Sequence, residues 1–170
     1  MAVIKFIVLT GGQHESGNDE HFRVGNQAMS TEILFQISNF IVLPFWALMI
    51  FAPHWLWTKR LMASLWVVAP SAALHLGLTA PQLGYIFTSL ASRPTAAGVA
   101  ALMSDPIVAT ISWAHFLAID LFIGRWIYLD SRERNLTAWI VGPILGVAFM
   151  FSPIGFLFYL AARYISGRRR

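Results

Sequence analysis

Three polar residues, His115, Asp120 and Arg125, lie within one apolar segment at positions 113–130, WAHFLAIDLFIGRWIYLD. Each of these side chains is costly to place in the hydrocarbon of a bilayer, so helices that only anchor a protein rarely carry them. Asp120 is also one of only four acidic residues after position 32. A chemical site in this chain is therefore expected in this segment.

Two of these residues have the chemistry of a proton-transfer pair, with Asp120 and His115 as acid and base. At about 100° per residue, they are adjacent around a helix but not stacked, so they are expected to line one cavity from two directions. His75, in the preceding apolar segment, is the expected cross-helix partner of Asp120. In the alternative interpretation, Asp120, Arg125 and His75 form a buried network that fixes helix register. Arg125 then reaches either the membrane surface or Asp130.

Pigment binding is a further use for these side chains, because an imidazole in a membrane helix can hold the magnesium of a chlorophyll. His75 and His115 are the candidate ligands for such a pigment. Trp113 shares a predicted helix face with Asp120, and Trp126 shares another with His115, so both tryptophans are candidate contacts to a bound pigment. No metal site is predicted, since the chain has no Cys and its membrane histidines lack a repeated spacing such as HxxxH.

Composition places the segment in an integral membrane protein. The chain has 170 residues, of which 57% are hydrophobic and 12% charged, against about a quarter charged in soluble domains. Its mean hydropathy is +0.63 and its pI about 10. The basic residues flank apolar segments, so membrane lipid headgroups rather than nucleic acid are the expected partners.

An all-α bundle of four transmembrane helices is the predicted fold, because a spanning helix needs about 20 mostly apolar residues. Between the second and third spans, residues 79–104 are expected to lie at the interface, with a short helix at 95–103; a re-entrant segment is the alternative. Prolines inside three of the spans predict kinked helices. The four expected spans are residues 33–51, 61–78, 106–128 and 136–165.

The chain is predicted to consist of two parts. Residues 1–28 form a polar arm or an over-extended start, and residues 29–170 form the transmembrane domain. With four spans, the basic residues after Met29 divide evenly between the two sides, so the positive-inside rule gives no firm orientation. The arginine triplet at 168–170 favours cytoplasmic termini.

Three segments carry a resemblance to a known family: NFIVLPFWALMIFAPHWLWTKRLM, SDPIVATISWAHFLAIDLFIGRWIYLDS and FMFSPIGFLFYLAARY. They look like the plant neoxanthin synthase (abscisic-acid-deficient) family and its bacterial relatives, long catalogued as a domain of unknown function. The likeness covers about Met29 to Tyr164. Its specific part is the run WxHFLAxDLFxGRWxxxD, which contains His115, Asp120 and Arg125.

The resemblance implies a multi-pass protein of an inner or photosynthetic membrane, with a carotenoid as its ligand. Plant members are required for converting the epoxide of violaxanthin into the allene of neoxanthin. That isomerisation needs proton donation to the epoxide oxygen and proton loss from a neighbouring carbon. On this model Asp120 and His115 supply both transfers, and Arg125 stabilises an alkoxide.

Residues 1–28 do not resemble a plastid transit peptide, which indicates a bacterial protein with a different carotenoid substrate. The alternative function is a non-catalytic accessory subunit of a photosynthetic pigment–protein complex, a reaction centre or an antenna. Its partners would be the other subunits of that complex, and a chlorophyll-type pigment would be the second choice of ligand after a carotenoid.

Overall fold

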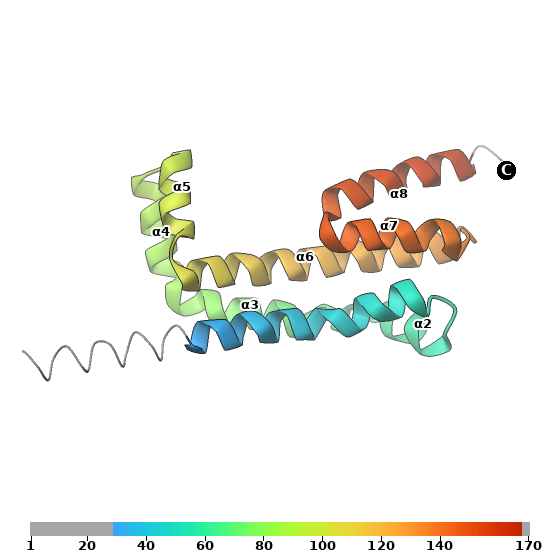
Figure 1. Ribbon diagram of the computed structural model, residues 1–170, viewed down its shortest axis with the longest axis horizontal. Coiled ribbons are helices and arrows are strands. Elements are labelled where there is room, and N and C mark those ends of the chain that lie inside the picture. The colour runs from blue at the N-terminus through green and yellow to red at the C-terminus, as the bar shows by residue number, and fades with distance from the viewer. Residues whose placement is uncertain (1–28, 168–170) are drawn as a thin grey trace, which may run out of the picture. The chain divides into compact units, whose positions relative to one another are not determined.

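A computed structural model describes residues 29–167, and every regular element in that range is helical. The arm 1–28 and the tail 168–170 lie outside the described residues. Contacts divide the chain after Leu34, and the packing below is that of the unit beginning at Phe35. The helices are the first helix (Met29–Phe51), α2 (Leu56–Ala63), α3 (Ala69–Thr79), α4 (Leu83–Ser92), α5 (Ala96–Met103), α6 (Pro106–Glu133), α7 (Ala138–Met150) and α8 (Ser152–Gly167) (Figure 1).

Two of these helices are long and apolar enough to cross a membrane: the first helix, with 23 residues, and α6, with 28. They contain the segments expected at 33–51 and 106–128, so these two predictions of continuous helix are confirmed. Asp105 caps α6, because its Oδ1 accepts hydrogen bonds from the backbone N–H groups of Ile107 at 2.9 Å and Val108 at 3.4 Å. Pro106 then begins the helix, where a missing N–H does no harm.

The second predicted span is not one continuous helix, so the expectation of an unbroken helix over 61–78 is wrong. The chain forms α2, a 3-10 turn at Leu65–Val67, α3 and a second 3-10 turn at Ala80–Gln82. The break lies at Ser64, which has extended backbone (φ −82°, ψ 133°) and whose hydroxyl accepts a hydrogen bond from the N–H of Trp66. Pro70 then stands in the first turn of α3, a position where proline is tolerated.

The fourth predicted span is also wrong, because residues 136–165 form a hairpin of α7 and α8. Helix α7 ends at Phe151, where the backbone leaves the helical region (φ −140°, ψ 75°), and Pro153 follows in the new helix. Gly155 lies so close to α7 that a Cβ atom there would collide with the backbone of Ala148. Pro143 lies inside α7 and does not end it.

The segment between the second and third expected spans contains more helix than the sequence predicts. The short helix expected at 95–103 is confirmed as α5, whose N-terminus is capped by the hydroxyl of Thr95. Helix α4 precedes it and was not expected. Several of its apolar side chains are exposed, Phe87 by 73%.

The buried core surrounds Trp46, which packs against α6 at Gly124, where a Cβ atom would collide with the indole ring. Small hydroxyl side chains are buried with it, including Thr58 and Ser131, whereas large apolar side chains such as Trp66 (81%) and Trp139 (90%) are exposed. Exposed apolar surface on this scale marks a face for lipid or for a partner protein.

Candidate functional site

The only predicted site residues in direct ring contact are two imidazoles. His75 of α3 and His115 of α6 have ring centroids 5.0 Å apart, with the planes inclined by 56°. His75 is half-buried between the helices, and His115 is exposed. This pairing differs from the prediction that His75 would partner Asp120.

The contacts of His75 indicate which of its nitrogens carries hydrogen. Its Nδ1 lies 3.3 Å from the carbonyl oxygen of Ile111, one turn before His115 on α6. A carbonyl only accepts, so this hydrogen bond requires the proton on Nδ1 and leaves Nε2 with a free lone pair in the neutral ring. The hydroxyl of Thr79 lies 3.4 Å from Nδ1 and 3.5 Å from Nε2. The imidazole is therefore oriented from both helices.

Asp120 faces a different neighbour from His115. It lies near the hydroxyl of Ser152, the first residue of α8. That hydroxyl is buried and has no hydrogen-bond partner among the described residues. The N-terminal end of a helix carries partial positive charge, which suits a carboxylate at this position. The structure thus places His115 against α3 and Asp120 against the tip of the hairpin.

Arg125 forms hydrogen bonds with backbone carbonyl groups at the break in the second apolar segment. It is 9% exposed, and its Nε and Nη2 donate to the carbonyl oxygens of Ser64 at 3.3 Å and Ala63 at 3.0 Å. These carbonyls end α2 and have no partner within that helix. A cation at the C-terminus of a helix also complements its dipole. Arg125 thereby joins α6 to the end of α2.

The two candidate tryptophans lie at separate packing contacts rather than around one ligand. Trp113 packs against Phe35 at 5.5 Å between centroids, and its Nε1 donates to Asn39 Oδ1 at 3.1 Å. Trp126 packs against Phe156 and, edge-on, against Tyr159. The first tryptophan fastens α6 to the first helix, and the second fastens it to α8.

A polar cluster that the sequence analysis did not predict surrounds Asp130. Its Oδ2 accepts a hydrogen bond from the Tyr159 hydroxyl at 2.5 Å and from Arg134 Nε at 2.8 Å, and Arg163 Nε lies 3.4 Å away. The expected bond from Arg125 to Asp130 does not form, since Arg125 is bonded to the end of α2. The i, i+4 spacing of Asp130 and Arg134 is a signal readable in sequence, but Tyr159 and Arg163 reach them only through the hairpin.

An apolar cavity of about 270 Å³ lies on the other side of the α2 end. Aromatic side chains from three elements line it, namely Phe45, Trp57 and Trp66, and Ser64 borders it as well. The carbonyl oxygen of Ser64 also accepts a hydrogen bond from Arg125, and Arg60 of α2 is a further lining residue of the cavity. Among the described residues, no three His, Asp or Glu side chains gather as a metal site would need.

Comparison with known proteins places these features in one family. A family model described as ABA DEFICIENT 4-like matches residues 33–159. The protein "ABA DEFICIENT 4, chloroplastic" of Arabidopsis thaliana is 28% identical over 137 residues, which cover 78% of this chain and 61% of that protein. The chain therefore spans about three fifths of the length of this relative. No solved structure matches it. The matched range includes His75, His115, Asp120 and Arg125, whereas Arg163 lies just beyond it.

Proposed function

The chain belongs to the ABA DEFICIENT 4-like family, and from this premise we propose that it is a multi-pass membrane protein that binds a carotenoid and isomerises it. The observation that carries the proposal is the contact between His75 and His115. The two rings, with centroids 5.0 Å apart, bring two acid–base side chains from different helices to one place. Such a pair can give a proton to one atom of a substrate and take a proton from another.

The proposed reaction conserves atoms and protons. A protonated imidazole donates its proton to an oxygen of the carotenoid while a C–O bond breaks, and the neutral imidazole removes a proton from a neighbouring carbon. The pair ends with the same number of protons as it had at the start. The unprotonated Nε2 of His75, which the Thr79 hydroxyl approaches at 3.5 Å, suits the base. The exposed ring of His115 suits the acid, because it meets substrate arriving from the lipid.

In this proposal Asp120 and Arg125 position the helices rather than touch the substrate. Asp120 lies near the first residue of α8, and Arg125 binds the end of α2. The apolar cavity beside Ser64 has the chemistry to receive a carotenoid end ring, since aromatic side chains surround it. Trp113 and Trp126 then contribute through the packing of α6.

Membrane insertion is proposed in a form that differs from four complete spans. The first helix and α6 cross the membrane, and the broken segment from α2 to α3 crosses beside α6. Helices α7 and α8 have 13 and 16 residues, about 20 and 24 Å at 1.5 Å per residue. Each is shorter than the roughly 30 Å hydrocarbon layer, so they enter and leave from one side.

The second candidate is an accessory subunit of a photosynthetic pigment–protein complex. The exposure of His115 favours it, because an outward-facing imidazole could also hold a chlorophyll-type pigment. The two functions differ in what co-purifies: the accessory subunit would be isolated with other polypeptides and with chlorophyll. The enzyme would be isolated alone, with a carotenoid.

The test is expression in a carotenoid-producing host that lacks this protein, followed by chromatography and mass spectrometry of the pigments. The unaltered protein is expected to yield a new carotenoid isomer. We expect His115→Gln and His75→Gln to lower its formation at least about 100-fold, at equal amounts of membrane protein. Asp120→Asn should lower the amount of folded protein and leave the conversion by each folded molecule within about threefold.

His21→Gln, outside the described residues, is the matched histidine control and should convert as the unaltered protein does. Full conversion by both His75→Gln and His115→Gln would refute the proposed acid–base pair. If no isomer forms and no carotenoid co-purifies, the carotenoid function itself is refuted.

A further inference from the structure

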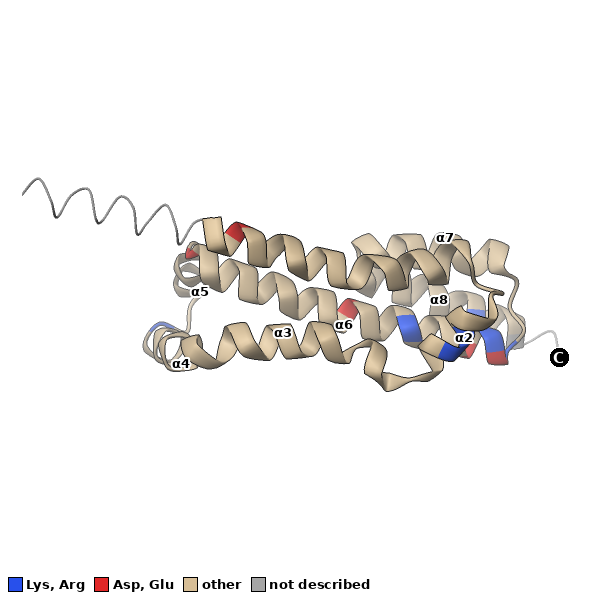
Figure 2. Cartoon of the chain, turned by 90° about the horizontal axis from the view of Figure 1, so that it is seen from below, with Lys and Arg blue, Asp and Glu red and all other residues tan. Residues whose placement is uncertain are grey.

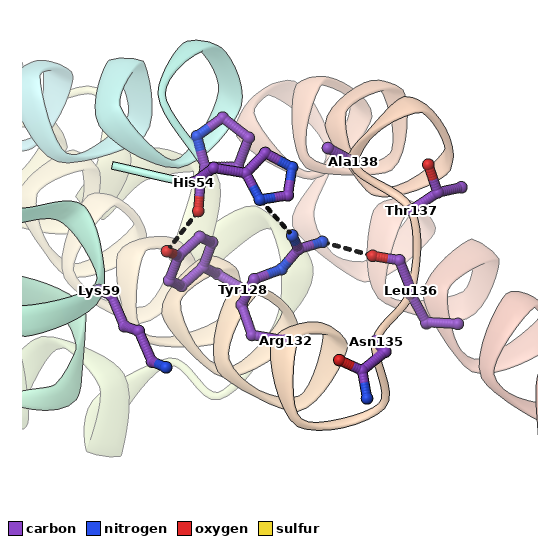
Figure 3. Close-up of a pocket in the computed structure, with 9 residues that line it drawn as sticks. His54, Lys59, Tyr128, Arg132, Asn135, Leu136, Thr137 and Ala138 are labelled. Carbon is purple, nitrogen blue, oxygen red and sulfur yellow. Dashed lines mark hydrogen bonds between the residues drawn. The ribbon is translucent and has the colours of Figure 1, made fainter. Parts of the chain in front are cut away.

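A second cavity, of about 400 Å³, lies where α2 begins, α6 ends and α7 begins. Three basic side chains line it: His54 from the turn before α2, Lys59 from α2 and Arg132 from α6 (Figure 3). The turn at 135–138, between α6 and α7, completes the wall. No carboxylate is among the lining residues. The cavity is separate from the imidazole pair and from the apolar cavity beside Ser64.

The walls of this basic cavity are fixed by hydrogen bonds from α6. The Tyr128 hydroxyl donates to the carbonyl oxygen of Pro53 at 2.8 Å and so holds the turn that carries His54. Arg132 Nη2 donates to the carbonyl oxygen of Leu136 at 2.6 Å, and Nη1 lies 3.5 Å from Nδ1 of His54. Asn135 has a positive φ of 56°, a conformation that Asn tolerates. It reverses the chain into α7.

The cavity has unsatisfied hydrogen-bond donors but no anion of its own. Arg132 Nε is buried and has no acceptor among the described residues. The ammonium group of Lys59 has no hydrogen-bond or ion-pair partner among the described residues. Helix α7 begins here, and its N-cap Thr137 makes no side-chain capping bond, so the first N–H groups of α7 remain unsatisfied by that side chain and carry partial positive charge.

From these observations we propose that the basic cavity binds a phosphate group, and that its source is the headgroup of an anionic membrane lipid. The guanidinium, ammonium and imidazole groups provide charge-assisted donors for phosphate oxygens. A lipid is favoured over a free anion because tryptophans adjacent in sequence to the walls of the cavity are exposed. Trp55 and Trp57 are each 54% exposed and Trp139 is 90% exposed. Tryptophan gathers at the membrane–water interface, where headgroup phosphates lie.

The distribution of basic residues also favours a membrane lipid as the source of the phosphate. Lys and Arg gather around α2 and the C-terminal part of α6 (Figure 2). A phosphate held by Lys59 and Arg132 would bridge α2 and α6 at the point where α7 begins. This inference rests on the proposed membrane insertion but not on carotenoid chemistry. The lipid-binding proposal and the carotenoid proposal can therefore fail independently of each other.

The test uses the full-length protein, purified in a neutral maltoside detergent and freed of lipid. Short-chain phosphatidylglycerol, short-chain phosphatidylcholine and inorganic phosphate are titrated separately, and bound ligand is counted by native mass spectrometry. We expect one phosphatidylglycerol to bind saturably, with phosphatidylcholine and inorganic phosphate at least tenfold weaker. Lys59→Gln is expected to weaken phosphatidylglycerol about fivefold, the usual effect of one basic residue near an anionic surface.

Arg132→Gln is expected to weaken binding more, but it also removes the bond to Leu136, so Lys59→Gln is the deciding variant. Arg134→Gln is the matched control. It removes the same charge from the same part of α6, but its side chain is directed at Asp130, and binding should change less than twofold. Equal weakening by Lys59→Gln and Arg134→Gln would overturn the proposed site. Inorganic phosphate binding as tightly as phosphatidylglycerol would overturn the lipid source.

Discussion

At the scale of single residues, the polar groups of α6 have separate partners rather than one shared site. His115 contacts His75, Asp120 lies near Ser152, and Arg125 binds the end of α2. Each partner lies on a different element. A charged residue in a membrane helix is usually taken as a functional signal, but here Arg125 has a structural task that its hydrogen bonds explain in full.

We predict that Arg125→Gln destabilises the protein by about 1–2 kcal/mol, because interhelical hydrogen bonds in membrane proteins have this size at most. The carbonyl oxygens of Ala63 and Ser64 would lose their charged donor. Arg125→Lys should recover part of the loss, since an ammonium can reach one carbonyl but not two in fork geometry. Thermal unfolding in detergent, followed by tryptophan fluorescence, measures the change. Arg93→Gln, which removes an exposed charge between α4 and α5, is the control, and a loss equal to that of Arg125→Gln would contradict the prediction.

At the scale of elements, the α7–α8 hairpin is the main departure from a simple helical bundle. Its tip, at Ser152, lies level with Asp120, and its returning helix brings Arg163 to Asp130. These two positions on α6 are ten residues apart, about 15 Å along the helix. Under the proposed membrane insertion, the hairpin would therefore reach roughly half of a 30 Å hydrocarbon layer.

Close approach within this hairpin depends on Gly155. We predict that Gly155→Ala lowers stability by about 1–3 kcal/mol, the usual effect of overpacking, because its Cβ would collide with the backbone of Ala148. Gly146→Ala, in the middle of α7, is the matched control. Nothing lies within 4 Å of a Cβ there, and alanine favours helix over glycine, so stability should be unchanged or higher. Thermal unfolding of the two variants side by side tests this, and equal stability would refute the close packing of α7 and α8.

At the scale of the whole described unit, the hairpin changes how basic residues are distributed. Because Arg163 returns to Asp130, it lies at the same end as Arg132 and Arg134, and Lys59 reaches this end through the basic cavity. Helices α4 and α5 lie at the opposite end (Figure 2), and Arg93 is in the turn between them. The even division of charge expected from four spans is replaced by a strong asymmetry. Under the proposed membrane insertion, the positive-inside rule predicts that the end with the basic cavity faces the cytoplasm.

This topology predicts which sites share a side of the membrane. The sequence contains no Cys, so single-cysteine variants can be labelled with an impermeant maleimide without further changes. We expect Thr137→Cys and Ile165→Cys to react only after the cells are permeabilised, and Ser92→Cys to react in intact cells. A single span over 136–165 would instead place Thr137→Cys and Ile165→Cys on opposite sides. That result would exclude the hairpin.

The sequence by itself determined the helical class, the continuous helices at 33–51 and 106–128, and the family resemblance carried by WxHFLAxDLFxGRWxxxD. These follow from local properties, because hydrophobic length and residue type act within one segment. Helical period also put His115 and Asp120 on adjacent faces of α6, but they were expected to line one cavity, and in the structure their neighbours lie on α3 and α8.

Only the tertiary structure decided which residues meet and where apolar segments end. Proline content could not predict the breaks: Pro143 lies within α7, whereas the chain turns at Phe151, two residues before Pro153. The turn depends on the packing of Gly155 against Ala148, which joins two helices. The partners of Asp120, Arg125 and Asp130 likewise lie on other helices. Helix–helix packing decides which residues become these partners, and the spacing of residues within one helix does not predict them.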